Sequence, residues 1–284
     1  MEYLYLGEAM TLLDGKKTSE RILAQLKEKI AGMERAPRLE IILVGDNAAS
    51  RKYVGMKMKT GEQIGVEVNL NEMIEAPATE DVVHYIGQLN SDPEVSGLMV
   101  QLPLPEGIDT PAVLESIDPA KDVDGLTATN LGLLYQRNPL AIAAATPRGV
   151  MSLLDEYGVE IEGKDVVIMG PTPVVGLPLA AMMLARGETV TVCHDKTPDV
   201  RAATSMADIL VSAVGKGHFI KQDWVKEGAA IVDVGLSPDE SGKLIGDVDF
   251  EDVKGKCSFI TPVHGGVGPM TVASLFANLV EISQ

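Results

Sequence analysis

The sequence predicts an α/β protein made of two three-layer α/β/α domains. Short apolar runs typical of buried strands alternate with stretches of helical periodicity along the chain. This alternation indicates parallel sheets whose strands are connected by helices. A second series of the same kind opens at Thr146-Pro147-Arg148-Gly149, where threonine can cap a helix and proline can take its first position. We therefore expect a domain boundary between residues 145 and 146.

Composition and charge exclude several classes of protein. The chain has 284 residues, of which 45% are hydrophobic, so disorder is not expected. Its formal net charge of −17 argues against nucleic-acid binding, which needs a basic surface. No apolar run approaches the ~20 residues of a membrane helix, and the first residues lack a signal-peptide pattern. We expect a cytoplasmic protein with no membrane or nucleic-acid partner.

Two further expectations come from the ends and the cysteines. Residues 1–9 look like an appendage, because Met10–Lys16 has the pattern of a natural opening strand and turn. Cys193 and Cys257 fit neither a disulfide framework nor a metal site, so both are interpreted as buried thiols. No metal site is expected.

The first domain is predicted as an alternation of strands and helices that starts after the opening turn. Thr18 or Ser19 is expected to cap the first helix, and Thr79 a later one. The remaining elements are a strand at 39–45, a helix at 48–64, a strand at 66–70 and a strand at 97–101.

Tyr53 and Lys57 are the first candidates for chemistry. They are four residues apart on the helix that follows the strand at 39–45, so they share one helix face. A lysine whose pKa is lowered by burial or by a neighbour can transfer protons near neutral pH. A solvated pair of side chains is the competing interpretation of this spacing.

Gln101 and two carboxylates mark further positions in the first domain. Prolines at 103 and 105 stop the strand at 97–101 and leave Gln101 at its carboxyl end, where ligands of α/β sheets bind. Asp122 and Asp124 lie in a loop that ends in a glycine turn, and such acids are often turn or capping residues.

The second domain has the order of a dinucleotide-binding unit. A buried strand at 165–170 runs into a loop with Gly170 and Gly176, then a helix at 179–186 and a strand at 189–193. Phosphates bind at the N-terminus of the helix in such units. The fingerprint lacks a middle glycine, so the loop alone is a weak signal. Further strands are predicted at 208–214 and 229–234.

Taken together, the segments from Met10 to the C-terminus resemble the bifunctional methylenetetrahydrofolate dehydrogenase/cyclohydrolase family. Each motif is weak alone, but five in the same order are specific. The motifs are Ser50-x-x-Tyr53-Val54-x-x-Lys57, Val100-Gln101-Leu102-Pro103-Leu104-Pro105, Lys121-Asp122-Val123-Asp124-Gly125, Gly246-Asp247-Val248-Asp249-Phe250 and Gly265-Gly266-Val267-Gly268-Pro269-Met270-Thr271.

The resemblance implies a folate-binding catalytic domain at 1–145 and a Rossmann-like NADP- or NAD-binding domain at 146–269. The last helix, residues 270–284, is expected to return to the first domain, and a homodimer is expected. The implied activity is oxidation of 5,10-methylenetetrahydrofolate to the methenyl form and its hydrolysis to 10-formyltetrahydrofolate.

The resemblance also implies roles for individual residues. Lys57 would shuttle the proton, Gln101 would orient it, and Tyr53 would lie against the folate. Asp124, Gly266 and Pro269 are implied to bind substrate. Cofactor binding is implied for Gly170, Pro171, Thr172, Gly176, Asp195 and Leu236.

The cofactor loop departs from the family pattern in ways that favour NAD. Pro171 stands where a basic residue commonly contacts the 2′-phosphate of NADP, and Asp195 follows the next strand. A carboxylate there binds ribose hydroxyls and repels a 2′-phosphate. Lys196 and Arg201 are near enough in sequence to compensate. His264 replaces a common proline and is interpreted as filling a turn.

Three alternatives stay open from the sequence. One is a 2-hydroxy-acid or shikimate-type dehydrogenase with a similar two-domain plan, which leaves Gln101 and the Lys121–Gly125 loop unexplained. Another is a methylenetetrahydrofolate dehydrogenase without cyclohydrolase activity, which Lys57 argues against. The third is a nucleotide-binding module without catalysis.

Overall fold

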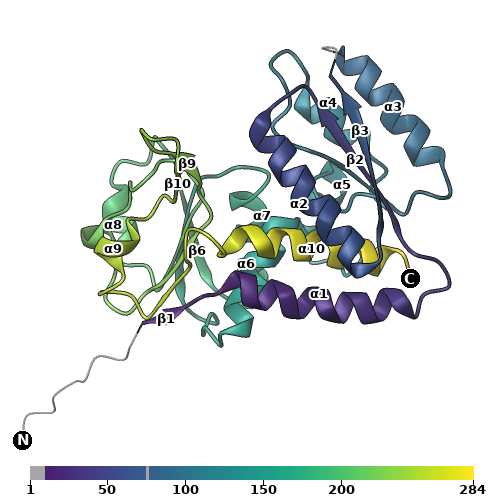
Figure 1. Ribbon diagram of the computed structural model, residues 1–284. Helices are drawn as coiled ribbons and strands as arrows, with labels where there is room; N and C mark the ends of the chain where they lie inside the picture. Colours follow the sequence, from purple (N-terminus) through teal and green to yellow (C-terminus); the bar gives the residue numbers. More distant parts are fainter. Residues whose placement is uncertain (1–9, 75–76) are drawn as a thin grey trace, which may run out of the picture. The chain divides into compact units, whose positions relative to one another are not determined.

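The computed structural model describes residues 10–74 and 77–284, and contacts divide the chain into two compact units (Figure 1). The three-stranded unit comprises Ser19–Arg148 and Thr271–Gln284. The six-stranded unit comprises Gly149–Met270 together with the described residues up to Thr18. The predicted appendage at 1–9 lies outside the described residues.

The three-stranded unit is built on a parallel sheet with the order β3-β2-β4. Strand β2 occupies the centre, and every residue from Leu39 to Val44 is buried, as expected for a parallel strand covered on both faces. Its elements are α1 (Gly15–Ala31), β2 (Arg38–Val44), α2 (Ala48–Ile64), β3 (Glu67–Met73), α3 (Thr79–Ser91), β4 (Gly97–Val100), α4 (Thr110–Glu115), α5 (Ala128–Tyr135), the start of α6 (Ala145–Glu156) and most of α10 (Val267–Ile282).

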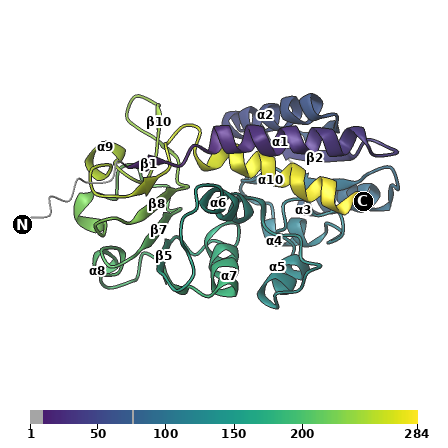
Figure 2. The same cartoon turned by 90° about the horizontal axis from the view of Figure 1, so that it is seen from below.

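Two apolar cores cover the two faces of this sheet. One contains side chains of α1, α2 and α10 against Leu39, Ile41 and Leu43. The other contains side chains of α3 and α4 against Ile42 and Val44. Figures 1 and 2 show α10 beside α1, far from it in sequence. The three layers and the return of the last helix to this unit are thus confirmed.

The six-stranded unit has a parallel sheet with the order β1-β11-β8-β7-β5-β6. The chain moves from β5 outward to β6 and then crosses to β7 on the other side of β5, which is the strand order reversal of doubly wound folds. Its elements are β1 (Thr11–Leu12), β5 (Asp165–Met169), α7 (Gly176–Arg186), β6 (Thr189–Cys193), α8 (Val200–Thr204), β7 (Ile209–Ser212), η1 (Gln222–Trp224), β8 (Ala230–Asp233), β9 (Ser237–Pro238), β10 (Leu244–Ile245), α9 (Phe250–Val253) and β11 (Phe259–Ile260).

The core of the six-stranded unit explains its apolar strands. Val167, Leu210 and Ile231 pack on one face with side chains of α8, α9 and η1, while α7 contacts β5 and β6. Cys193 and Cys257 are free and buried in this core, as the sequence predicted.

Two predictions of helix caps were wrong. Helix α1 begins at Gly15, so neither Thr18 nor Ser19 caps it; the Asp14 carboxylate accepts from the Lys17 amide at 2.9 Å instead. Thr79 is the first residue of α3, and its hydroxyl accepts from the Asp109 amide. Capping by a nearby Ser or Thr is a local preference that a better-placed carboxylate or a tertiary partner overrides.

The opening residues also group differently from the predicted domain at 1–145. Thr11 pairs with Phe259, so β1 extends the sheet of the six-stranded unit. A strand of two residues carries no pattern that indicates which sheet it joins, which is why the sequence could not place it.

Candidate active site

Lys57 lies on the buried face of α2. The buried residues of this helix are Ser50, Val54, Lys57, Gly61 and Ile64, which recur at helical spacing. The Lys57 side chain is only 7% exposed, at a position where the pattern calls for an apolar residue. A lysine buried in this way costs free energy, so its place on this face needs an explanation beyond packing.

The side chain of Gln101 is the hydrogen-bond acceptor for Lys57. Gln101 follows β4, and its backbone amide donates to the Ile42 carbonyl at 2.9 Å. Its side-chain Nε2 donates to the Leu102 carbonyl at 2.7 Å, and its Oε1 accepts from Lys57 Nζ at 2.9 Å. The first side-chain bond fixes the amide so that its oxygen faces Lys57. The predicted pairing of these two residues is present in the structure.

Burial lowers the pKa of the Lys57 ammonium below its ordinary value, and the nearby Asp124 carboxylate partly opposes this by raising it. A neutral amide partner adds no charge that would hold the lysine protonated. Because the Lys57 Nζ–H donates to Gln101, the lone pair of a neutral amine stays free to accept a proton. The pair therefore has the properties of a proton-transfer group.

The two carboxylates of the loop after β4 have different surroundings. Asp122 is 1% exposed and accepts from the backbone amides of Gly125 and Thr127 and from Asn130 Nδ2, so it fixes the loop. The Asp124 carboxylate accepts no hydrogen bond from any residue that the structure describes. Burial raises the pKa of Asp124, which the nearby Lys57 lowers in part. Asp124 is thus available to a ligand, whereas Asp122 is a turn residue.

Two more polar groups of α2 belong to this neighbourhood. Tyr53 is half-buried, and its hydroxyl has no hydrogen-bond partner within the described ranges. Ser50 Oγ is buried and also lacks a partner there. A buried hydroxyl without a partner is uncommon and is often found where a ligand or water binds. The sequence interpretation assigned no role to Ser50, although it quoted the residue in the motif.

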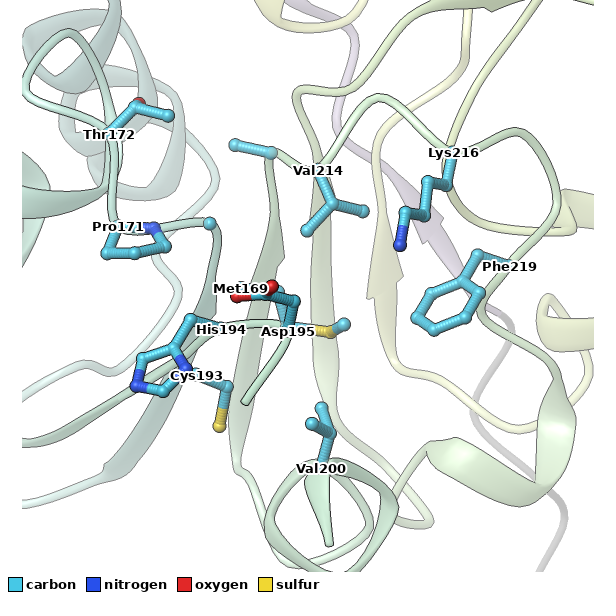
Figure 3. A pocket seen from close by; sticks show the side chains of 12 residues that line it. Met169, Pro171, Thr172, Cys193, His194, Asp195, Val200, Val214, Lys216 and Phe219 are labelled. Atoms are coloured by element: carbon cyan, nitrogen blue, oxygen red, sulfur yellow. The ribbon is translucent and has the colours of Figure 1, made fainter. Parts of the chain in front are cut away.

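A second site lies at the carboxyl ends of β5, β6 and β7 in the six-stranded unit. It is a cavity of about 400 Å³ where the strand order reverses, the usual position for a nucleotide in this fold. Figure 3 shows Pro171, Thr172 and His194 on one side and Lys216 and Phe219 on the other. The lining residues are Met169, Gly170, Pro171, Thr172, Cys193, His194, Asp195, Val200, Ala213, Val214, Lys216 and Phe219.

The glycines of the predicted phosphate loop are required by the backbone. Gly170 has a φ of +100°, and a Cβ there would lie 2.4 Å from the Ala213 carbonyl oxygen. A Cβ on Gly176 would lie 1.9 Å from the Gly170 carbonyl oxygen, so the start of α7 touches the loop. Within the described residues, the N-cap residue of α7, Val175, makes no side-chain hydrogen bond to the helix. Close backbone approach and an uncapped helix start are what a dinucleotide phosphate needs, so these residues fit such a group.

The other predicted ligand residues are placed as follows. Gly170, Pro171, Thr172 and Asp195 line the cavity, while Gly176 supports its loop and Leu236 lies in the loop after β8, 37% exposed. Gly266 and Pro269 belong to the six-stranded unit, at the start of α10. Lys57, Gln101 and Asp124 belong to the three-stranded unit. The roles of Gly266, Pro269 and Leu236 stay predictions.

The cavity has a cation that the sequence interpretation missed. Lys216 is the one lysine or arginine among its lining residues, and its ammonium lies 5.5 Å from the centre of the Phe219 ring. Arg201, expected as a compensating charge, pairs with Asp223 at 2.6 Å. The rule that ligand residues follow strand ends applies to β7 as well, and extending it there would have identified Lys216.

The fold and these two sites define a two-unit α/β protein with a buried Lys57–Gln101 pair in one unit and a cavity at the strand-order reversal in the other. Family models match both parts: the tetrahydrofolate dehydrogenase/cyclohydrolase catalytic domain over residues 13–124 and the corresponding NAD(P)-binding domain over residues 144–284. The chain belongs to the tetrahydrofolate dehydrogenase/cyclohydrolase family and is an enzyme.

Relatives match over nearly the whole chain. The bifunctional protein FolD of Aliarcobacter butzleri is 46% identical over 279 residues, which is 97% of each protein. The crystal structure of the Campylobacter jejuni bifunctional FolD enzyme is 46% identical, with a TM-score of 0.93 over 97% of this chain and 99% of that one. A Trypanosoma brucei FolD structure in complex with NADP and an inhibitor is 36% identical, with a TM-score of 0.93 over 98% of both chains.

These matches decide between the alternatives that the sequence left open. Membership in this family excludes the 2-hydroxy-acid and shikimate-type dehydrogenases as the function of the chain. Among the described residues, no helix is both long enough and apolar enough to span a membrane.

Proposed function

We propose that this enzyme oxidises 5,10-methylenetetrahydrofolate to 5,10-methenyltetrahydrofolate with NAD(P) and hydrolyses the product to 10-formyltetrahydrofolate. The observation that carries the proposal is the buried Lys57–Gln101 pair, with its hydrogen bond of 2.9 Å and its lowered lysine pKa. The three-stranded unit is the folate-binding part of the chain, and the six-stranded unit is the dinucleotide-binding part.

Lys57 performs the proton transfers of the hydrolytic step. The neutral Lys57 amine accepts a proton as water adds to the methenyl carbon, and the resulting ammonium returns it to the folate nitrogen as the ring opens. Gln101 holds the amine through its Oε1, which accepts an N–H, so the lone pair is left free for the proton of the attacking water. A cationic methenyl carbon nearby lowers the pKa of Lys57 further, which favours the neutral base.

Asp124 and Tyr53 bind the pterin. The Asp124 carboxylate has free acceptor positions and accepts from the pterin amino and ring N–H groups, a charge-assisted pairing. Tyr53, one turn before Lys57 on α2, presents a half-buried ring on which the pterin can stack. Gly266 and Pro269 are assigned to the same substrate by the family motif.

The oxidative step needs alignment rather than a base. A bound nicotinamide would supply the acceptor for the hydride that leaves the methylene carbon of the folate. Gly170, Thr172 and the start of α7 would hold the phosphates, and Asp195, at the end of β6, would accept from ribose hydroxyls. These contacts would hold the dinucleotide in one orientation within the six-stranded unit.

NAD is favoured over NADP. Asp195 lies in the cavity and repels a 2′-phosphate, and Pro171 offers no donor to one. Arg201 is engaged by Asp223, while Lys216 supplies a cation on the opposite wall. We expect kcat/KM to be about tenfold higher with NAD than with NADP, because one hydrogen bond to the Asp195 carboxylate contributes roughly that much. A clear preference for NADP would overturn this part. The enzyme is further expected to act as a homodimer in the cytoplasm.

The test follows methenyl-folate formation and decay with each dinucleotide for the wild type and Lys57→Met. We expect the variant to lose cyclohydrolase activity by at least about 100-fold, the scale of a removed general base, and to keep dehydrogenase activity. Lys59→Met, an exposed lysine on the same helix, is the matched control and should leave both activities unchanged. Full hydrolysis by Lys57→Met would refute the assignment, and a wild type that never hydrolyses methenyl-folate would indicate a monofunctional dehydrogenase.

A further inference from the structure

Asp247 is a buried carboxylate to which neither step gives a role. It comes from the Gly246–Phe250 motif and is 0% exposed. Its Oδ2 accepts from Ser212 Oγ and from the Val214 amide, both at 2.8 Å, and its Oδ1 accepts from the Lys216 amide at 2.7 Å. All three donors lie at the end of β7 or directly after it. One side chain therefore fixes the path of residues 212–216.

Residues 213–216 form one wall of the dinucleotide cavity. Ala213, Val214 and Lys216 line it, and the Lys216 side chain runs along the wall toward Phe219 (Figure 3). Gly215 has a φ of +67°, so the chain turns sharply between Val214 and Lys216. The two backbone amides that Asp247 binds flank this turn. The direction in which Lys216 leaves the backbone thus depends on the Asp247 carboxylate.

The surroundings of Asp247 leave it no alternative position. A Cβ on Gly235 would lie 2.1 Å from the Asp247 carboxylate, so that residue must be glycine. The Asp247 amide donates to Asp233 Oδ1 at 3.1 Å, and the Val248 amide donates to Asp233 Oδ2 at 2.9 Å. A second carboxylate therefore holds the backbone of the first. Burying the carboxylates of Asp233 and Asp247 so close together costs free energy that an apolar pair would avoid. Their presence therefore indicates that the backbone they bind has to be held in one conformation.

We propose that Asp247 is a positioning residue for the dinucleotide: it sets the turn at 214–216 and so places the Lys216 ammonium against a phosphate of the cofactor. The proposal rests on the proposed function, which assigns the cavity to NAD(P). Asp247 acts only through the backbone of residues 214–216. Lys216 supplies the one lysine or arginine charge among the lining residues, opposite the Asp195 carboxylate.

The experiment compares Asp247→Asn with Asp249→Asn. An amide at 247 turns an N–H donor toward at least one of the backbone amides, so the turn at 214–216 must shift. We expect the KM for dinucleotide to rise at least about tenfold, the cost of an unpaired buried donor, while hydrolysis of methenyl-folate, which needs no dinucleotide, stays within about twofold. Asp249 caps α9 and pairs with Lys221 at 2.6 Å, away from the turn, so Asp249→Asn should change neither value.

Two further variants separate positioning from general stability. Lys216→Gln alone should raise the dinucleotide KM. In the double variant with Asp247→Asn, the rise in KM, taken as free energy, should be less than the sum of the two single effects, because both substitutions remove the same contact of Lys216 with the phosphate. Ser212→Ala, which removes one donor to Asp247, should raise the same KM about two- to fivefold. It carries the test if Asp247→Asn does not fold.

Several outcomes would overturn the proposal. An unchanged dinucleotide KM in Asp247→Asn would do so, as would full additivity of the Asp247→Asn and Lys216→Gln effects in the double variant. An equal loss of both activities in Ser212→Ala would also do so. If Asp247→Asn does not fold, an unchanged dinucleotide KM in Ser212→Ala would overturn it. A wild type that uses neither dinucleotide would instead refute the proposed function. Comparing NAD with NADP in Lys216→Gln identifies the phosphate: an equal rise in KM indicates the pyrophosphate, and a rise confined to NADP indicates the 2′-phosphate.

Discussion

The two sites of this enzyme use burial in opposite ways. At Lys57 an ionisable side chain is withdrawn from water, and the proton transfer that we propose for it depends on the resulting lowering of its pKa. In the cavity after β5, β6 and β7, the charged side chains of Asp195 and Lys216 line opposite walls, and the buried carboxylate of Asp247 binds the backbone of the wall that carries Lys216. Proton transfer needs an altered pKa, whereas dinucleotide binding needs a rigid backbone. Each site therefore fails in its own way when altered.

The largest separation of the two activities is expected from Gly176→Ala. The new Cβ would lie 1.9 Å from the Gly170 carbonyl oxygen, so α7 and the phosphate loop must move apart. We expect dehydrogenase activity to fall by more than about 100-fold, since sub-ångström misplacement at such loops is costly, with cyclohydrolase activity retained. Gly87→Ala on α3, where a Cβ meets nothing within 4 Å, is the control. Equal loss of both activities would show that the sites do not fail separately.

A second expected effect, about 100-fold, concerns charge at the Lys57 site. Gln101→Glu places a carboxylate beside the Lys57 ammonium and raises its pKa, so less of the neutral base exists at pH 7. Cyclohydrolase activity should fall by about 100-fold at pH 7 and recover as the pH is raised. The pH–rate profile measures this directly. Gln101→Leu removes the acceptor without adding charge, so its profile should not move to higher pH; if it moves as far, the effect is not electrostatic.

In the dinucleotide cavity, Asp195→Ser is expected to change the preference between NAD and NADP by about tenfold. Removing the carboxylate removes the repulsion of a 2′-phosphate, so kcat/KM with NADP should rise relative to NAD by about tenfold. Cyclohydrolase activity should not change, because hydrolysis of methenyl-folate needs no dinucleotide and Asp195 lines the dinucleotide cavity. Steady-state kinetics with both dinucleotides give the ratio. An unchanged ratio would assign the preference to Pro171 or Lys216 instead.

The sequence was sufficient for the fold and for the local parts of each site. Helix α2 at Ala48–Ile64 and strand β2 follow from hydrophobic periodicity, and the Lys57–Gln101 pair follows from strand-end placement and the family motif. Long-range partners were not visible. The Thr11–Phe259 pairing and the three bonds of Asp247 join segments that no local pattern connects. Burial of a single polar side chain depends on the packed neighbours, so Ser50 and Asp247 could not be distinguished from ordinary polar residues.

The smallest expected effect tests whether a buried charge without a catalytic role only costs stability. Glu188 is 5% exposed, and neither carboxylate oxygen has a partner in the described part of the chain. Burial raises the pKa of Glu188, partly offset by its own backbone N–H and then by Arg186, which is itself bound to Asp155. The folded state therefore binds the Glu188 proton more tightly than the unfolded state. The contribution of Glu188 to the stability of the folded state is therefore fully present below the ordinary glutamate pKa. It is lost as the pH rises through the raised pKa of the folded state.

Glu188→Gln removes this charge and should stabilise the protein by about 1–2 kcal/mol at pH 8, which is a rise of a few degrees in Tm. The difference should shrink toward pH 4, where the wild-type carboxyl is protonated. Thermal unfolding of both proteins across this pH range measures the effect, with the exposed Glu240→Gln as control. Both activities should be unchanged, because burial at Glu188 serves no proton transfer. A lower Tm of the variant at pH 8 would mean that the buried carboxylate has a stabilising partner. Glu188 would then be a structural carboxylate like Asp247, and its burial would not be a cost without a role.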